Sequence, residues 1–338
     1  MALATAVPAH ELRDEAVAAL ARQLFGGVLE RVGPVHANSG VHHRYSCVAP
    51  EWYLRRHGWA ERARLFARHA TDLAARATID ALARAGLSIK AVDAIVAVST
   101  TGVATPSLDA LLIDRLGLRP DVVRLPIFGL GCAGGVLGLA RAGALARAMP
   151  GANVLLVVVE LCGLTFRVDD RTPANVVATA LFGDGCAAAV LSTRGQGPRL
   201  SAWADHTWPD TLEVMGWRIE DDGFGVLFSR DIPAIVTSRL RPALDGWLSG
   251  LGLTRADIDG WACHPGGAKV VTALEEALGI DRGTLADERA ILASHGNMSA
   301  ATVLFVLARR LAAPLPRRVV ATALGPGFTA GFLLLEGP

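Results

Sequence analysis

Apolar residues along this chain recur in two patterns, one typical of amphipathic helices and one typical of buried strands. Helical spacing marks residues 9–30, 60–85 and 232–251, whereas short continuous apolar runs mark Val92–Val98 and Asn153–Glu160. Runs of the second kind are typical of strands that are covered on both faces by helices. The alternation of long helices with such strands therefore predicts an α/β protein.

Segments that show neither of these two patterns lie between the predicted helices and strands. Residues 33–46 are predicted to form a loop, residues 162–180 a less regular stretch, and residues 200–228 short strands broken by glycine. Ser, Gly and Pro cluster over residues 192–198, which form the best candidate for a linker. Because 338 residues exceed the size at which one core usually keeps growing, we expect two halves, residues 1–195 and 196–338.

The second half repeats the order of the first. The predicted strand at 257–263 parallels that at 91–97, and the one at 318–324 parallels Asn153–Glu160. Gly131-Cys132 and Gly296-Asn297 each open a helical stretch at equivalent places, and Gly183-Asp184-Gly185 and Gly325-Pro326-Gly327 each precede a closing strand. Two fused halves of this kind would bury a helix from each half between two sheets, and would bring Cys132 and Asn297 face to face.

The duplicated positions carry the residues with the most reactive chemistry. We expect Cys132 to lie at a helix N-terminus, where the helix dipole favours a thiolate and can lower the pKa of a thiol. His264, at the end of its strand, is placed to meet Cys132 and to stabilise the thiolate as an imidazolium. Asn297 can donate an amide N–H to an oxyanion or enolate. We therefore predict Cys132, His264 and Asn297 as one catalytic group.

Composition narrows the class of protein further. With 51% hydrophobic and 19% charged residues the chain resembles a well-buried globular protein, and its net charge of +1 argues against a nucleic-acid partner. Five cysteines without CxxC spacing or a preceding signal peptide favour a cytoplasmic location, and no apolar run is long enough to span a bilayer. His36, His42 and His43 share a loop, but without ligand-spaced Cys or carboxylates we predict no metal site.

Four motifs together resemble the signatures of type III polyketide synthases, the chalcone-synthase-like branch of the thiolase fold. They are Gly131–Gly135, Cys263–Gly267, Gly296–Ala301 and Gly325–Gly327. The resemblance spans nearly the whole chain and implies a homodimer with duplicated five-layer αβαβα subunits, acting on coenzyme A thioesters without a metal or redox cofactor. It also implies that Cys132 holds the acyl chain as a thioester, while the other two catalytic residues orient malonyl-CoA and stabilise its enolate.

The resemblance also implies residues that contact the substrate. Phe182 matches a phenylalanine that guards the active-site entrance, whereas Val226 stands where chalcone-type enzymes have a second one. Trp217 replaces a glycine of those enzymes, and Cys162 and Thr165 fall on cavity-lining positions. Ser299, within the asparagine motif, is also assigned to substrate binding.

Within the family, Glu160–Phe166 and Phe228–Pro233 are most similar to bacterial alkylresorcinol and alkylpyrone synthases, which use long fatty acyl starters. The loss of an aromatic side chain at Val226 suits an alkyl tunnel, since burial of each CH₂ contributes about 0.8 kcal/mol. We therefore expect an acyltransferase that extends an acyl-CoA with malonyl-CoA and closes the product by aldol reaction or lactonisation.

Coenzyme A contacts are expected at a few cationic or backbone groups, because its phosphates need cations or helix N-termini. Arg31 is a candidate, although Pro34 and Asn38 occupy places where the family has cations. Gly266, Gly267 and Lys269 are the other candidates.

Three alternatives stay open. One is a ketoacyl synthase of the type that starts fatty acid synthesis, one a polyketide synthase with a short or malonyl starter, and one a non-catalytic partner of another synthase. A Cys–His hydrolase is a more distant possibility.

Overall fold

Two sheets of matching topology form the frame of the molecule. The computed structural model describes residues 1–195 and 197–337, apart from the side chains of Arg31 and Val32. The N-terminal sheet has the order β1-β7-β6-β4-β5, in which β4, β5 and β6 are parallel to one another and β7 runs antiparallel to both of its neighbours, β6 and β1. Its strands are β1 (Ala2–Ala6), β4 (Ala94–Ser99), β5 (Val123–Phe128), β6 (Asn153–Leu161) and β7 (Asp184–Ser192).

Within residues 1–195 and 197–337, the C-terminal sheet repeats this arrangement without a counterpart of β5. Its order is β11-β12-β13-β8, with a parallel β11–β12 pair followed by antiparallel pairs, which matches β4-β6-β7-β1. The strands are β8 (Arg199–Thr207), β11 (Gly260–Cys263), β12 (Arg318–Gly325) and β13 (Thr329–Glu336). The predicted internal duplication is confirmed by this topology. The boundary predicted between residues 195 and 196 stays a prediction.

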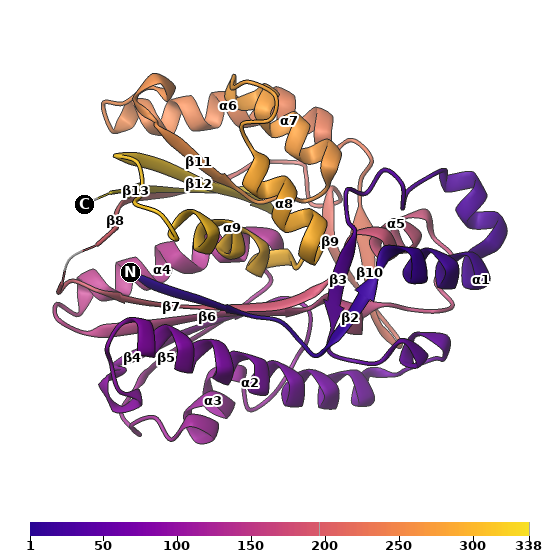
Figure 1. The fold of residues 1–338 in the computed structure, drawn as a ribbon, viewed down its shortest axis with the longest axis horizontal. Helices are drawn as coiled ribbons and strands as arrows, with labels where there is room; N and C mark the ends of the chain where they lie inside the picture. Colours follow the sequence, from indigo (N-terminus) through magenta and orange to yellow (C-terminus); the bar gives the residue numbers. More distant parts are fainter. Residues whose placement is uncertain (196, 338) are drawn as a thin grey trace.

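Helices and sheets alternate in five layers (Figure 1). Helices α2 (Trp59–Arg84) and α3 (Leu108–Leu116) cover the outer face of the N-terminal sheet, and α6 (Ile232–Gly250) and α7 (Ala268–Leu278) that of the C-terminal sheet. Between the sheets lie α4 (Gly134–Ala148) and α9 (Thr302–Arg310), one from each half. This is the predicted αβαβα architecture.

Glycine allows the two central segments to approach closely. A Cβ atom at Gly135 in α4 would lie 2.3 Å from the Ala300 carbonyl oxygen, and one at Gly134 would lie 3.0 Å from the Ala300 Cβ. Ala300 belongs to a short 3₁₀ turn before α9. The glycines that follow Cys132 therefore bring its helix against the turn that follows Asn297.

A group of smaller elements lies at one end of the layers (Figure 1). It contains α1 packed on α5, and two small two-stranded sheets that belong to neither large sheet. Helix α8 joins α7 to the turn that precedes α9. The bounds are β2 (His10–Arg13), α1 (Asp14–Val32), β3 (His43–Ser46), α5 (Pro173–Leu181), β9 (Met215–Glu220), β10 (Gly223–Phe228) and α8 (Ala286–His295).

Three local predictions are wrong in part. The helix expected over residues 9–30 begins at Asp14, because His10–Arg13 forms β2 and pairs with β3, part of the expected loop at 33–46. That pairing joins residues 30 to 36 positions apart, so a local pattern does not reveal it. The stretch at 162–180 contains α5, which begins with Pro173 after the N-cap Thr172. A Thr-Pro pair is a helix-start signal that the sequence already contained.

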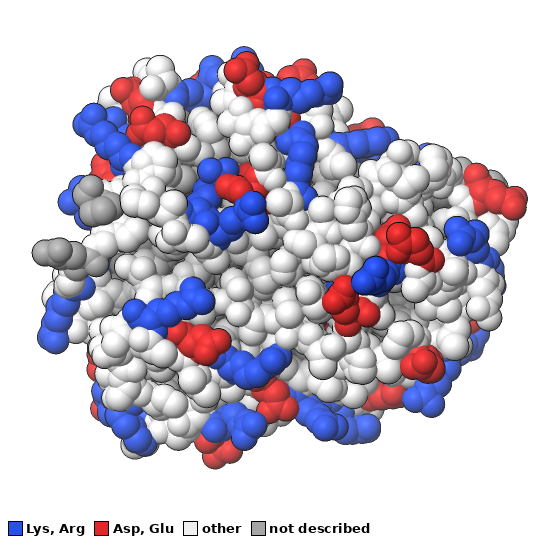
Figure 2. All heavy atoms as spheres, in the orientation of Figure 1, with Lys and Arg blue, Asp and Glu red and all other residues white. Residues whose placement is uncertain are grey.

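Charged side chains on the face shown in Figure 2 are interspersed in sign, with an uncharged region across the middle. In the described part of the chain, no helix combines the length and the apolar character needed to cross a membrane.

Candidate active site

Cys132 lies in a 3₁₀ turn, Gly131–Ala133, that runs directly into α4. Gly131 has a positive φ of 48°, and its N–H donates to Thr100 Oγ1 at 2.9 Å. A Cβ atom at Gly131 would lie 2.4 Å from Pro326 Cδ, so the turn after β12 packs tightly here. Cys132 as a whole residue is partly exposed, and its Sγ lies 3.8 Å from Ser299 Oγ. The predicted position before a helix is thus confirmed.

His264 follows the last residue of β11 and is 5% exposed. Its backbone N–H donates to the Thr322 carbonyl oxygen at 2.9 Å, which extends the β11–β12 pairing by one residue. The N–H of the preceding residue, Cys263, has no strand partner at this sheet edge and donates to the buried Glu288 carboxylate at 2.9 Å. The backbone before His264 is therefore held on both sides.

Asn297 is held by both backbone and side chain. Its N–H donates to the Leu181 carbonyl oxygen at 2.7 Å. Its Oδ1 accepts the Ser299 N–H at 2.8 Å, and its Nδ2 donates to the Gly266 carbonyl oxygen at 3.2 Å. These contacts fix which way the amide faces, and they leave one Nδ2 hydrogen for another acceptor.

A small cavity brings these three side chains together. Its volume is about 20 Å³, enough for one water molecule. Cys132, His264 and Asn297 form its polar wall, together with Gly266 and Thr322, and its apolar wall includes Met215, Phe228 and Leu324. Neither ring nitrogen of His264 has a hydrogen-bond partner among the described residues. The imidazole is therefore free to bond a reacting group.

Burial has the largest effect on the pKa values of Cys132 and His264. It raises the pKa of the Cys132 thiol to about 12, although side-chain hydrogen bonds with Ser299 and Asn297 oppose this rise. It also lowers the pKa of His264 to about 3. The expected lowering of the thiol pKa by the helix is therefore wrong, because desolvation outweighs it. Each group stays neutral unless a proton passes between them, which leaves the net charge of the cavity unchanged.

A buried acidic side chain near the thiol, Glu160, is a functional candidate that the sequence motifs do not reveal. Glu160 ends the charge-free run of β6 and is fully buried. Its Oε2 accepts from Thr100 N at 2.9 Å, Thr101 Oγ1 at 2.7 Å and Ser99 Oγ at 3.3 Å. Burial raises its pKa to about 7, while these donors and Ser299 oppose the rise. A lone acidic residue at the end of a buried strand was the signal that could have found it.

We expect the substitution Glu160→Gln to flatten the pH dependence of stability. The folded protein binds this proton with a pKa of about 7, against an ordinary 4.5, so the Glu160 contribution is full below pH 4.5 and is lost as pH rises towards 7. The loss is roughly 3 kcal/mol. Urea unfolding at pH 5 and pH 8 should show the variant gaining this amount relative to wild type. If the free energies of unfolding of the variant and the wild type changed equally between the two pH values, the raised pKa of Glu160 would be contradicted.

A larger apolar cavity lies beside the catalytic one. Its volume is about 390 Å³, within the range of small-molecule sites. One wall is the inner side of α1, with Ala16, Val17, Leu20, Leu24 and Phe25. The other walls include all four residues predicted at the entrance and lining, namely Cys162, Thr165, Phe182 and Val226.

The two cavities are adjacent through Phe182. This residue forms an isolated parallel β-bridge with Asn297, and its side chain lines the apolar cavity. Trp217 packs edge-on against Phe182, with ring centroids 6.1 Å apart, and pairs directly with Val226 across the β9–β10 hairpin. Trp217 thus lies behind the predicted gate.

Three of the four residues predicted to contact coenzyme A lie together at the start of α7. Gly266 lies in the catalytic cavity, Gly267 caps the N-terminus of α7, and Lys269 is exposed in the first turn of that helix. The side chain of Arg31 lies outside the described residues. In the described part of the chain, no three His, Cys, Asp or Glu side chains gather as a metal site, and His36 bonds Asp14 at 3.0 Å.

Comparison with known proteins covers both halves. The family description of the chalcone and stilbene synthase N-terminal domain matches residues 55–195, and that of the C-terminal domain matches residues 199–338. A putative chalcone synthase of Bacillus subtilis is 35% identical over 99% of this chain and 98% of its own length. A 1,3,6,8-tetrahydroxynaphthalene synthase of Streptomyces peucetius is 39% identical over 99% of this chain and 92% of its own.

A solved structure has the same overall fold. The 1,3,6,8-tetrahydroxynaphthalene synthase of Streptomyces coelicolor, a bacterial type III polyketide synthase, superposes with a TM-score of 0.95 and 30% identity. The match covers 99% of this chain and 98% of that one.

Proposed function

The chain belongs to the chalcone and stilbene synthase family and is a type III polyketide synthase that condenses malonyl-CoA with an acyl-CoA starter, and we propose that this starter is a long-chain fatty acyl-CoA. The product is then an alkylresorcinol or an alkylpyrone. The observation that carries this proposal is the apolar cavity of about 390 Å³ beside the catalytic cavity. Its walls offer aliphatic side chains along α1 and a small side chain at Val226, where an alkyl chain would be buried.

The first half-reaction would load the starter on Cys132. A proton passes from the thiol to His264, and Sγ attacks the thioester carbonyl carbon. The tetrahedral oxyanion collapses, the bond to the coenzyme A sulfur breaks, and the imidazolium returns its proton to that thiolate. Because burial opposes either charge alone, the proton transfer and the attack are coupled.

The second half-reaction would form the new carbon–carbon bond. The carboxylate of malonyl-CoA leaves as CO₂, and its electron pair forms an enolate at the thioester oxygen. His264 and the free Nδ2 hydrogen of Asn297 donate to that oxygen. The enolate carbon attacks the Cys132 thioester carbonyl carbon, and the bond from that carbon to Sγ breaks. Cys132 leaves as a thiolate, which takes up a proton from solvent, and the product is a longer acyl-CoA.

Contacts with coenzyme A are proposed at the start of α7. Gly266 and Gly267 offer backbone groups beside the catalytic cavity, and Lys269 offers an exposed cation close to the N-terminus of that helix. Trp217, behind Phe182, would shape how the extended chain folds before ring closure. An unchanged product ratio in Trp217→Gly would count against that role.

The outer edge of β5 supports a homodimer. This strand ends the N-terminal sheet, and its side chains Val123, Leu125 and Phe128 are 43%, 37% and 54% exposed. An exposed apolar edge strand is a site for pairing with a second copy. Sedimentation equilibrium would disprove the dimer if it gave the 35.4 kDa of one chain.

A malonyl starter is the second candidate. It is favoured by the 39% identity to a relative named for tetrahydroxynaphthalene synthesis. In that case the apolar cavity would hold the growing polyketide rather than an alkyl chain.

The deciding experiment offers palmitoyl-CoA with malonyl-CoA, and malonyl-CoA alone, to the purified protein and identifies products by mass spectrometry. We expect alkylresorcinol or alkylpyrone only when palmitoyl-CoA is present. Aromatic product from malonyl-CoA alone, with no palmitoyl incorporation, would replace the long-chain proposal by the malonyl one. A requirement for acyl carrier protein would favour a ketoacyl-synthase-like role.

A further inference from the structure

The β9–β10 hairpin borders both cavities but belongs to neither large sheet. Met215 and Phe228, at its open end, line the catalytic cavity, and Val226 lines the apolar one. The hairpin is a separate two-stranded sheet, in which Val226 pairs with Trp217. Among the described residues, no sheet hydrogen bonds hold it against the opposite wall, and a two-stranded hairpin alone is marginally stable.

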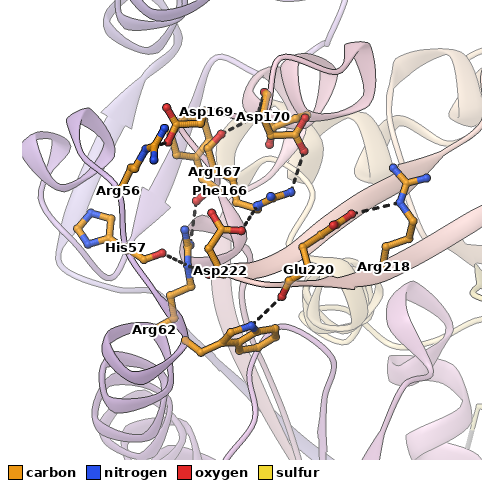
Figure 3. Close-up of polar contacts among 12 residues, drawn as sticks. Arg56, His57, Arg62, Phe166, Arg167, Asp169, Asp170, Arg218, Glu220 and Asp222 are labelled. Carbon is orange, nitrogen blue, oxygen red and sulfur yellow. Dashed lines mark hydrogen bonds and ion pairs between the residues drawn. The ribbon is translucent and has the colours of Figure 1, made fainter.

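Side chains from α2 and from the segment after β6 hold the tip of this hairpin (Figure 3). The Trp59 indole N–H donates to the Glu220 carbonyl oxygen at 2.8 Å. Arg167 Nε donates to Asp222 Oδ1 at 2.7 Å, and Arg62 Nε donates to the Asp222 carbonyl oxygen at 3.0 Å. The Trp59 ring also packs edge-on against Phe224, with centroids 4.9 Å apart.

The Arg62 guanidinium also holds the opposite wall. Its Nη1 donates to the Phe166 carbonyl oxygen at 2.8 Å and to that of Leu164, in the segment that carries Cys162 and Thr165. Its Nε also donates to the His57 carbonyl oxygen at 3.1 Å. Arg62 is 6% exposed, so these bonds are screened from water and one side chain ties three separate backbone segments together.

We propose that Arg62 is a specificity-determining residue that sets the width of the apolar cavity. It holds the hairpin wall with Val226 and the wall with Cys162 and Thr165 at a fixed separation, and so selects which acyl chains fit. The proposal rests on the function proposed above. Arginine suits this role because its planar group carries five fixed N–H donors, whereas lysine presents one nitrogen on a flexible stem.

Hydrogen bonds and ion pairs of neighbouring polar residues connect the hairpin tip to helix α5 and so to Phe182. Arg167, which bonds Asp222, also contacts Asp170 Oδ2 at 3.2 Å. Asn175 of α5 donates to the Arg167 carbonyl oxygen at 3.0 Å and to the Asp170 carbonyl oxygen at 2.7 Å. Helix α5 ends just before Phe182. The hairpin tip, the cavity lining and the gate therefore share one hydrogen-bonded support.

The test compares Arg62→Lys with wild type in two measurements. The first is hydrogen exchange of residues 215–228 and 162–166, which should rise together by at least about tenfold when the shared anchor is lost. The second is the ratio of kcat/KM for palmitoyl-CoA to that for hexanoyl-CoA, which should change by at least about fivefold. A merely structural role would lower both kcat/KM values by the same factor.

Two further variants keep the test decisive. Trp59→Phe removes one hydrogen bond to the hairpin tip but keeps the aromatic contact with Phe224. It replaces Arg62→Lys if that variant does not fold. It should shift the ratio of the two kcat/KM values in the same direction. The matched control is Arg241→Lys, whose guanidinium donates to carbonyl oxygens of Glu276 and Ala277 away from both cavities. It should leave the ratio unchanged.

Failure of the proposal differs from failure of the proposed starter. If hydrogen exchange rises in neither segment, or the ratio is constant in every variant, Arg62 does not set the cavity width. If the wild-type protein accepts neither acyl-CoA, the starter assignment fails, and hydrogen exchange then decides: a coupled rise in both segments supports the anchor, and an uncoupled one overturns it.

Discussion

Replacing Cys132 by alanine is expected to abolish polyketide formation, with a loss of at least about 10⁴-fold, because it removes the thiol that lies with His264 and Asn297 in the catalytic cavity. Cys132 is the partly exposed cysteine of the catalytic cavity, whereas Cys47, Cys162, Cys186 and Cys263 are buried. Intact mass spectrometry after incubation with palmitoyl-CoA should show one acyl adduct in wild type and none in the variant.

The matched control is Cys186→Ala, in strand β7 within the core against α2. This variant should still acquire the adduct, because the side chain lies in neither cavity. An acyl adduct that persists in Cys132→Ala would show that another residue is the nucleophile. Malonyl-CoA decarboxylation should continue in Cys132→Ala, since enolate stabilisation depends on His264 and Asn297.

Replacing His264 by alanine is expected to lower kcat/KM by about 10³-fold or more, because it removes both the proton acceptor for Cys132 and a donor to the enolate oxygen. Loading and decarboxylation should therefore fall together. Each is measured separately, by the rate of acyl adduct formation and by release of ¹⁴CO₂ from labelled malonyl-CoA.

The pH dependence gives an independent test of this residue. Burial lowers the pKa of His264 to about 3, so its imidazole stays neutral from pH 8 down to pH 5. Decarboxylation by the wild-type protein should therefore show no fall with an apparent pKa near 6.5, the ordinary value for histidine. The control His295→Ala removes a half-buried histidine at the end of α8, which lines neither cavity, and should retain activity. Equal losses in both variants would point to a structural effect.

Much of the architecture could be predicted from local patterns and from their repetition. The continuous apolar runs at Val92–Val98 and Asn153–Glu160 became β4 and β6, because a strand covered on both faces needs apolar residues at every position. The repeated order of strand, glycine turn and helix placed Cys132 and Asn297 at equivalent points. The trio with His264 therefore emerged from the sequence before its geometry was known.

Other features depended on contacts between distant segments. The β2–β3 pairing joins His10 with Ser46, and the cavity wall formed by α1 requires that helix to pack on α5. Arg62 appeared as one more arginine in an amphipathic helix, since nothing local reveals that its partners are carbonyl oxygens at residues 164, 166 and 222.

The protonation of the site was also decided by tertiary structure. A helix N-terminus after Cys132 favours the thiolate, and the sequence alone established that local term. Burial, which raises the pKa of Cys132 and of Glu160, depends on how many segments close over them. The sequence by itself determined the strands, the duplication and the identity of the reactive side chains, because these follow from local periodicity and spacing. Only the tertiary structure decided the cavities, the pKa values and the Arg62 anchor, because these arise where segments far apart in the chain exclude water together.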